Sequence, residues 1–247
     1  MESAFSQCYT KLLKEYTRPT IAFRDPNNIH NFIEYDTFWK RKQITGNVLF
    51  SGMNLTELPD LSDVYVYGDF SCSFNNLKSL KGSPMEVKFS FMCTNNILES
   101  LEHMTQKIGD DVDCSNNNLK SLYGAPDTIN GVFNCSSNNL KSLQYSPRVV
   151  KGAFNCKQND LNSLQGLPET IDGNFVWYNN NKITKEDFLK SIIFSNISGQ
   201  YFSGPPARYP FPVIDKDEVL KLIDHEQRKA RLPIVNDLDT EDDISRW

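Results

Sequence analysis

The apolar and polar positions of this chain follow a pattern that returns every 21 residues. Five of the six cysteines define it, because each lies 21 residues after the one before: Cys72, Cys93, Cys114, Cys135 and Cys156. Two positions before each cysteine stands a large apolar residue, at Phe70, Phe91, Val112, Phe133 and Phe154, and a sixth unit carries Phe175 with Trp177 in the cysteine position. A period of this length predicts a solenoid, whose units bury their apolar faces only by stacking on their neighbours.

Four more columns keep the same register. Five units have an asparagine, two leucines and a valine or isoleucine, whereas the sixth keeps the asparagine but has Lys182 in the first leucine position, and we expect the apolar columns to face inward. The asparagines are predicted to bond free backbone groups in the turn of their own and the next coil. The columns are Asn75, Asn96, Asn117, Asn138, Asn159 and Asn180; Leu77, Leu98, Leu119, Leu140 and Leu161; Leu80, Leu101, Leu122, Leu143 and Leu164; and Val87, Ile108, Ile129, Val150 and Ile171.

The Phe and Cys positions of each unit alternate with residues such as Asn155, and this period of two predicts a short strand. The residues Phe154, Cys156, Asn159, Leu161 and Leu164 spell F-x-C-x-x-N-x-L-x-x-L, which resembles the leucine-rich-repeat pattern. The residue sequence of these repeats is most similar to that of the short bacterial and phage repeats, and the resemblance covers about residues 48 to 183. It implies an α/β-type repeat solenoid: a parallel β-sheet leucine-rich-repeat array with helical N- and C-terminal caps.

The flanks of the repeat are predicted to close the ends of the stack, because an open solenoid end must be covered. Residues 1–45 are expected to form a helical or irregular cap that contains Phe32, Tyr35, Phe38 and Trp39, and residues 46–183 the solenoid. Residues 184–247 are expected to hold a helix that begins at a capping box of Thr184 and Asp187. A proline-rich aromatic arm (199–213), a second helix (215 to about 231) and an acidic tail (236–247) follow in this prediction.

Charge and hydropathy narrow the possible partners. The net charge of -5 disfavours a nucleic-acid partner, whose phosphates require clustered Lys and Arg. Residues 1–20 contain five charged residues, and no segment approaches the roughly 20 apolar residues of a membrane-spanning helix. We therefore expect a cytoplasmic protein without a membrane partner, in the host bacterial cytoplasm if a phage encodes it.

The sequence offers little catalytic chemistry. Zinc needs about four thiolates around one point, whereas the repeat places its cysteines in a line; five cannot pair completely as disulfides, and the cytosol keeps thiols reduced. We therefore predict buried free cysteines. His30, His103 and His225 match no nucleophile or metal pattern, and His103 occupies a turn position that is glycine in other units. The sequence thus predicts no catalytic, cofactor-binding or metal-binding residue and no enzyme.

The predicted partner-binding surface is the outward row of the sheet, formed by residues that flank the inward Phe and Cys columns. Its early units are acidic and its last unit is aromatic, and aromatic residues are typical interface anchors. The residues are Asp69, Met92, Asp111, Asp113, Asn134, Asn155, Lys157, Val176 and Tyr178. The alternative is that this row is only a solvated sheet face and that the termini or loops bind.

These observations predict a non-catalytic module that binds another protein, and the resemblance implies an inhibitor or effector that blocks a bacterial protein, of phage or bacterial origin. Two alternatives stay open. The chain could be a structural or assembly protein that self-associates, or an enzyme with a metal site built from Asp69, Asp111 and Asp113. The sequence leaves the identity of the partner and the oligomeric state undetermined.

Overall fold

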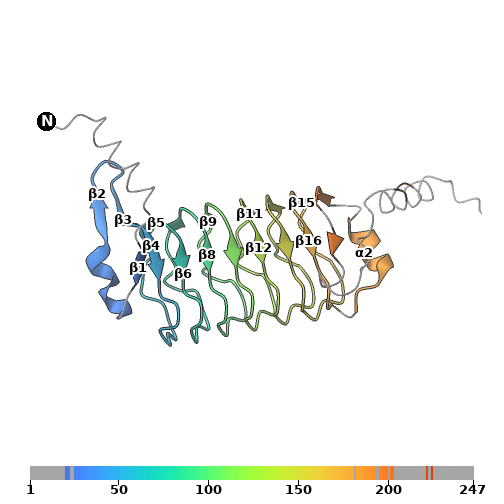
Figure 1. The fold of residues 1–247 in the computed structure, drawn as a ribbon, viewed down its shortest axis with the longest axis horizontal. Helices are drawn as coiled ribbons and strands as arrows, with labels where there is room; N and C mark the ends of the chain where they lie inside the picture. Colours follow the sequence, from blue (N-terminus) through green and yellow to red (C-terminus); the bar gives the residue numbers. More distant parts are fainter. Residues whose placement is uncertain are drawn as a thin grey trace, which may run out of the picture.

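The chain forms a parallel β-solenoid of about six turns with 21-residue spacing, which confirms the repeat predicted from the sequence. The computed structural model describes residues 20–22, 25–180, 182–192, 195–199, 201–202, 221 and 224. The coils lie side by side along one axis, with the N-terminal strands at one end of the stack and the helix α2 at the other (Figure 1).

The Phe-x-Cys column forms the larger sheet, which has nine parallel strands. Neighbouring strands pair with equivalent residues opposite one another, so that Phe133 lies between Val112 and Phe154. Its strands, in spatial order, are β1 (Thr20–Ala22), β4 (Asn47–Leu49), β6 (Phe70–Ser71), β8 (Phe91–Met92), β10 (Val112–Asp113), β12 (Phe133–Asn134), β14 (Phe154–Asn155), β16 (Phe175–Val176) and β18 (Tyr201–Phe202).

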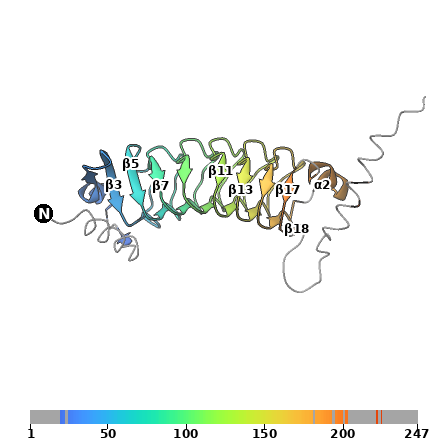
Figure 2. The same cartoon turned by 90° about the horizontal axis from the view of Figure 1, so that it is seen from above.

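The Val/Ile column forms a second row of strands, which the sequence analysis did not predict (Figure 2). This row is divided into two sheets. The first has five strands: β2 (Glu34–Asp36), β3 (Arg41–Thr45), β5 (Val64–Tyr67), β7 (Glu86–Val87) and β9 (Lys107–Ile108). The second has four: β11 (Thr128–Ile129), β13 (Val149–Val150), β15 (Thr170–Ile171) and β17 (Asn196–Ile197).

The row divides between β9 and β11, where a side chain takes the place of a backbone hydrogen bond. In the next coil the backbone N–H of Lys151 donates to the Ile129 carbonyl oxygen at 2.9 Å. One coil earlier, the side-chain amide of Asn130 donates to the Ile108 carbonyl oxygen at 3.3 Å. The coils therefore remain in contact at this point, although their strands do not pair as a regular ladder.

The core lies between the two rows of strands, and all the apolar columns face it as predicted. The phenylalanine, cysteine and both leucine columns are buried from the second coil onward, as is the Val/Ile column. The phenylalanine rings of successive coils stack, with centroids 5.8 Å apart for both Phe133–Phe154 and Phe154–Phe175. Each unit therefore depends on its neighbours for burial of its apolar residues.

The asparagine column ties each coil to the one before it. The Asn138 side-chain oxygen accepts the backbone N–H of Leu119 at 3.0 Å, and its NH₂ group donates to the carbonyl oxygens of Cys114, Cys135 and Ser136 at 3.1–3.2 Å. Asn75, Asn96, Asn117 and Asn159 repeat this arrangement. The predicted role is confirmed, but the second coil that each amide contacts is the preceding one and not the next.

The predicted helical caps are not supported, because the described residues contain little helix. The described residues of the N-terminal flank contain the short 3-10 helix η1 (Pro26–Phe32) and the antiparallel hairpin of β2 and β3. The helix η1 begins at Pro26, and the side chain of Asp25 caps its N-terminus. The described residues of the C-terminal flank hold one bounded α-helix, α2 (Lys185–Ile192). It begins where the sequence predicted, since Asp187 accepts the backbone N–H of Thr184 and returns its own N–H to the Thr184 hydroxyl.

Several predicted segments lie outside the described residues. These are the possible helix near the N-terminus together with Cys8, most of the aromatic arm, most of the second C-terminal helix and the acidic tail. Tyr201 and Phe202 of the arm form β18, the last strand of the nine-stranded sheet. Among the described residues, no helix combines the length and apolar character needed to cross a membrane.

We expect Asn138→Leu to lower the free energy of unfolding by about 2–4 kcal/mol, because buried backbone groups of two coils lose their partners. Urea unfolding followed by circular dichroism measures this change. Asn139→Leu is the matched control, since Asn139 is the exposed neighbour in the same turn. Equal stability of the two variants would contradict the role assigned to the asparagine column.

Candidate functional site

The solenoid places all nine predicted binding residues on the outer side of the nine-stranded sheet, which we call the nine-stranded face. Residues two apart along a strand point to the same side, so the positions that flank the inward Phe and Cys columns make three parallel rows. Asp69 and Asp111 lie in the row before the phenylalanine column, and Lys157 and Tyr178 in the row after the cysteine column. The middle row contains Met92, Asp113, Asn134, Asn155 and Val176, which are in register.

Many polar side chains of this face are already engaged with the backbone. Asp69 and Asp111 accept the N–H groups of Ser90 and Val132 in the next coil, at 3.1 and 2.6 Å. Asp113, Asn134 and Asn155 each accept the N–H group two residues ahead, at 3.0–3.2 Å. These bonds hold the side chains in fixed orientations, so the face is preorganised, and each residue keeps only part of its capacity for a partner.

The aromatic end of the nine-stranded face is more covered than the sequence suggested. Tyr178 is 9% exposed, with the Lys157 ammonium group 5.4 Å from its ring centroid. Trp177 points into the core and stacks on Phe188 of α2, with ring centroids 5.1 Å apart. Trp177 therefore closes the last coil, and Tyr178 offers a partner little more than one edge.

A second surface, which the sequence analysis missed, lies on the outer side of the five-stranded sheet. At its N-terminal end, the Arg41 guanidinium of β3 lies over the rings of Tyr65 and Tyr67 of β5, at 4.4 and 4.9 Å from their centroids. The centroid of the Trp39 ring lies 5.6 Å from the same guanidinium. We call Arg41, Gln43, Tyr65, Tyr67 and Trp39 the arginine–tyrosine cluster.

The hairpin next to this cluster exposes large aromatic side chains. Phe38 is 80% exposed, Tyr35 62% and Trp39 54%. These residues were predicted to be part of a cap over the first coil, but the side chains of this flank that are buried are those of Ile29 and Ile44. The signal that was missed is a period of two. Arg41, Gln43 and Thr45 occupy every second position of β3, as Tyr65 and Tyr67 do on the neighbouring strand β5, and this pattern indicates one exposed sheet face.

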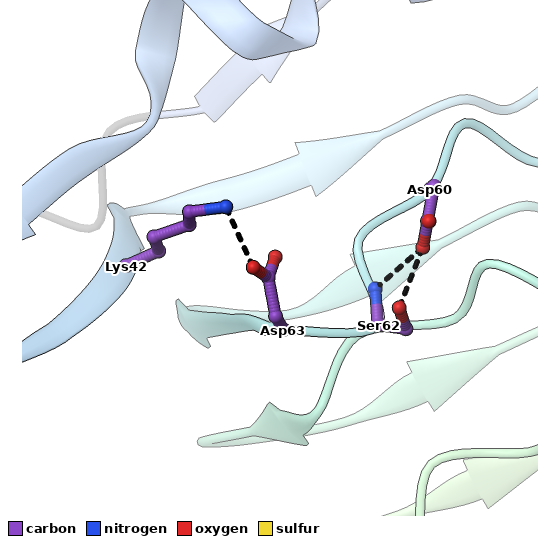
Figure 3. Close-up of polar contacts among 4 residues, drawn as sticks. All are labelled: Lys42, Asp60, Ser62 and Asp63. Atoms are coloured by element: carbon purple, nitrogen blue, oxygen red, sulfur yellow. Dashed lines mark hydrogen bonds and ion pairs between the residues drawn. The ribbon is translucent and has the colours of Figure 1, made fainter.

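The acidic groups beside the hairpin are engaged in local contacts (Figure 3). The Lys42 ammonium group lies 2.6 Å from a carboxylate oxygen of Asp63. Asp60 accepts the hydroxyl of Ser62 at 2.6 Å and its backbone N–H at 3.0 Å, and these hydrogen bonds lower the pKa of Asp60 below its ordinary value. Asp60 therefore stabilises the turn before β5, and Asp63 links this turn to β3.

The buried cysteines are poor nucleophiles. Cys72, Cys93, Cys114, Cys135 and Cys156 are free thiols inside the core, as predicted. Burial raises the pKa of Cys72 to about 12 and raises the pKa of the other four well above the ordinary value. Because the thiolate is the reactive form, these residues serve as small apolar side chains. No cluster of three metal-ligating side chains occurs in the part of the chain that the structure describes.

No protein-family model, no curated protein and no solved structure matches the chain. The parallel solenoid is shown by its own strands and register, whereas membership of the leucine-rich-repeat family stays a prediction based on the residue pattern. The function must therefore be argued from the surfaces of this molecule.

Because burial raises the pKa of the thiols, we expect the free energy of unfolding to fall in alkaline solution. An unfolded cysteine loses its proton near its ordinary pKa of 9.0, whereas the folded thiols keep theirs to about pH 12 or above. The buried thiols therefore contribute fully to the free energy of unfolding below pH 9. Above pH 9 this contribution falls by up to about 1.4 kcal/mol per pH unit for each thiol. Urea unfolding at pH 8, 9 and 10 measures the slope. Cys135→Ala should give a shallower slope, and an unchanged slope would contradict this account.

Proposed function

We propose that this protein is a non-catalytic module that binds another protein. One observation carries the proposal: the repeat gathers three rows of outward side chains into one rigid, continuous face on a sheet of nine strands. At about 4.8 Å per strand, the sheet extends on the order of 40 Å, and three rows with their side chains cover about 20 Å across it. This area is comparable to the ~800 Å² that each partner contributes to a standard protein interface.

The preorganisation of the face supports binding. Side chains that are already held by backbone hydrogen bonds lose little conformational freedom when a partner docks, and this lowers the entropic cost of association. The chemistry-bearing residues that recur in every coil, the cysteines and asparagines, are used in the core and unavailable at the surface. A surface suited to contacts, combined with reactive groups held in the interior, supports binding over catalysis.

The finer proposal is an inhibitor or effector that occupies a bacterial protein, with phage or bacterial origin and action in the bacterial cytoplasm. It is supported by the resemblance of the repeat to short bacterial and phage leucine-rich repeats. The lack of a catalytic pattern in the sequence agrees with a protein that acts by blocking a surface.

Self-association is the second candidate function, and the ends of the sheets favour it. The two rows of strands end in edge strands, such as β2, whose exposed residues include Glu34 and Tyr35. Edge strands can pair with another chain, although charged residues oppose such pairing. Assembly through these edges would be seen as a mass that rises with protein concentration in light scattering.

The test is affinity purification of the tagged protein from bacterial lysate, followed by reconstitution with each captured protein after separate purification. Met92→Arg and Val176→Arg place bulky charges on the nine-stranded face at positions whose apolar side chains make no hydrogen bond. We expect this double variant to lose at least tenfold in affinity for the partner because the charges prevent close contact, as measured by calorimetry.

The matched control is Glu102→Arg with Lys141→Glu, two exposed positions on the turns of other coils. It should bind the partner with unchanged affinity, and all variants should show the same thermal unfolding midpoint. Equal affinity of the control and the Met92→Arg, Val176→Arg variant would remove the nine-stranded face from the proposal. A chain that forms concentration-dependent oligomers and captures no partner would support the assembly function instead.

A further inference from the structure

Two buried polar atoms of β3 have unmet hydrogen-bonding capacity, and both belong to the arginine–tyrosine cluster. The Arg41 Nε atom, a donor, and the Gln43 Oε1 atom, an acceptor, are buried without a hydrogen-bond partner. Arg41 and Gln43 are two residues apart on one strand, so their side chains share a face of the sheet. Buried polar groups are normally satisfied, and an adjacent donor and acceptor left open together indicate a ligand that supplies both kinds of partner.

The Arg41 guanidinium also has no carboxylate partner among the described residues. The ion pairs in this part of the chain use Lys42, Lys120, Arg148 and His103 as their cations. Arg41 is instead held by three aromatic rings, which fix its position while its charge stays unneutralised. A planar guanidinium in a fixed orientation matches the geometry of a carboxylate, which it can bind through two parallel hydrogen bonds.

The surroundings of the cluster carry charges of both signs, so the preference for an acidic partner comes from Arg41 itself. Beyond the tyrosines, Glu86 pairs with Tyr65 on one side and with Lys107 on the other, and Lys88 lies two residues after Glu86. Together with Arg41 these residues make three positive groups against three negative ones, because Glu34 and Asp36 of β2 pair with Gln43 and Arg41 on the same sheet. The two lysines, Glu86 and Asp110 also line a groove of about 540 Å³ at the break between β9 and β11.

We propose that the arginine–tyrosine cluster recognises an acidic peptide segment of a protein partner. One carboxylate of the segment binds the Arg41 guanidinium, and a backbone N–H of the segment donates to Gln43 Oε1. Apolar side chains on either side of the carboxylate contact Trp39 and the exposed Phe38 of the hairpin. This proposal rests on the proposed function, because it assumes that the partner is a protein.

A peptide fits these atoms better than an anionic lipid surface does. Exposed Phe38 and Trp39 with the neighbouring Lys40 would also suit the headgroup region of a membrane. A phosphate group satisfies Arg41 but carries no N–H donor, so a lipid would need a headgroup amine to reach Gln43, whereas a peptide backbone carries donor and acceptor in every residue.

The test compares two fluorescein-labelled hexapeptides on the full chain by fluorescence polarisation. One peptide has two glutamates separated by apolar residues, and the other has glutamines at the same positions. We expect the glutamate peptide to bind at least tenfold more tightly than the glutamine peptide. In Arg41→Gln this preference should fall below twofold, and Arg41→Lys should keep only part of it, because lysine cannot form the two-bond contact.

Arg148→Gln is the matched control, because it removes an arginine whose guanidinium already pairs with Asp127 and Glu169. This variant should retain the full preference for the glutamate peptide. A second measurement is the nitrogen–proton NMR signal of the Arg41 side chain, which should shift on addition of the glutamate peptide and stay unchanged with the glutamine peptide. Thermal unfolding of each variant confirms that it is folded.

Two results would overturn the proposal. One is equal binding of the two peptides by the wild-type chain. The other is binding to phosphatidylserine vesicles that requires Phe38 and Trp39, with no preference between the peptides, which would assign the cluster to a membrane surface. If a captured partner protein binds Arg41→Gln as tightly as wild type, this site is rejected and the proposed function stays intact. If only the Met92→Arg, Val176→Arg variant loses affinity for that partner, binding takes place on the nine-stranded face.

Discussion

The structure depends most on the hydrogen bonds of the buried asparagine column. In each coil one amide accepts a backbone N–H of the preceding coil and donates to carbonyl oxygens of both coils, as Asn117 does with Leu98, Cys93 and Cys114. These backbone groups belong to a turn, where no strand partner is available, and would otherwise be buried unsatisfied. Because the asparagine must reach the same carbonyl in every coil, each unit must have the same length, and the 21-residue period follows.

The constant length places equivalent side chains in columns, and the columns form the core. The phenylalanine rings stack along the axis, and Val112 in place of one ring interrupts the stack without changing the register. The cysteines fit the same principle, because a small apolar side chain is needed beside a large ring. The last ring stacks on Phe188 of α2, so the helix continues the core beyond the last complete coil.

Features that repeat were predictable from the sequence, and features that depend on one contact were not. The inward columns and the asparagine role followed from periodicity alone, and His103 adopts the left-handed turn conformation expected from glycines in its position, with φ of 68°. The second row of strands was missed because it rests on a single apolar residue per coil between variable neighbours. The exposure of the hairpin was missed because a buried cap and an exposed cluster can have the same aromatic composition. The contact of Arg41 with Tyr65 was missed because it joins residues 24 positions apart.

The difference between the two faces follows from this division between repeated and unique residues. On the nine-stranded face, outward residues such as Asp111 and Asn134 also brace neighbouring backbone, so their orientation serves the fold as well as any partner. On the five-stranded face, Arg41 and Gln43 lie before the first full repeat and brace nothing through their open atoms. Leaving these atoms unpaired lowers the stability of the fold, and partner binding would offset that cost. The end of the solenoid is therefore where recognition can be specific, while the repeats supply the rigid support that holds it in place.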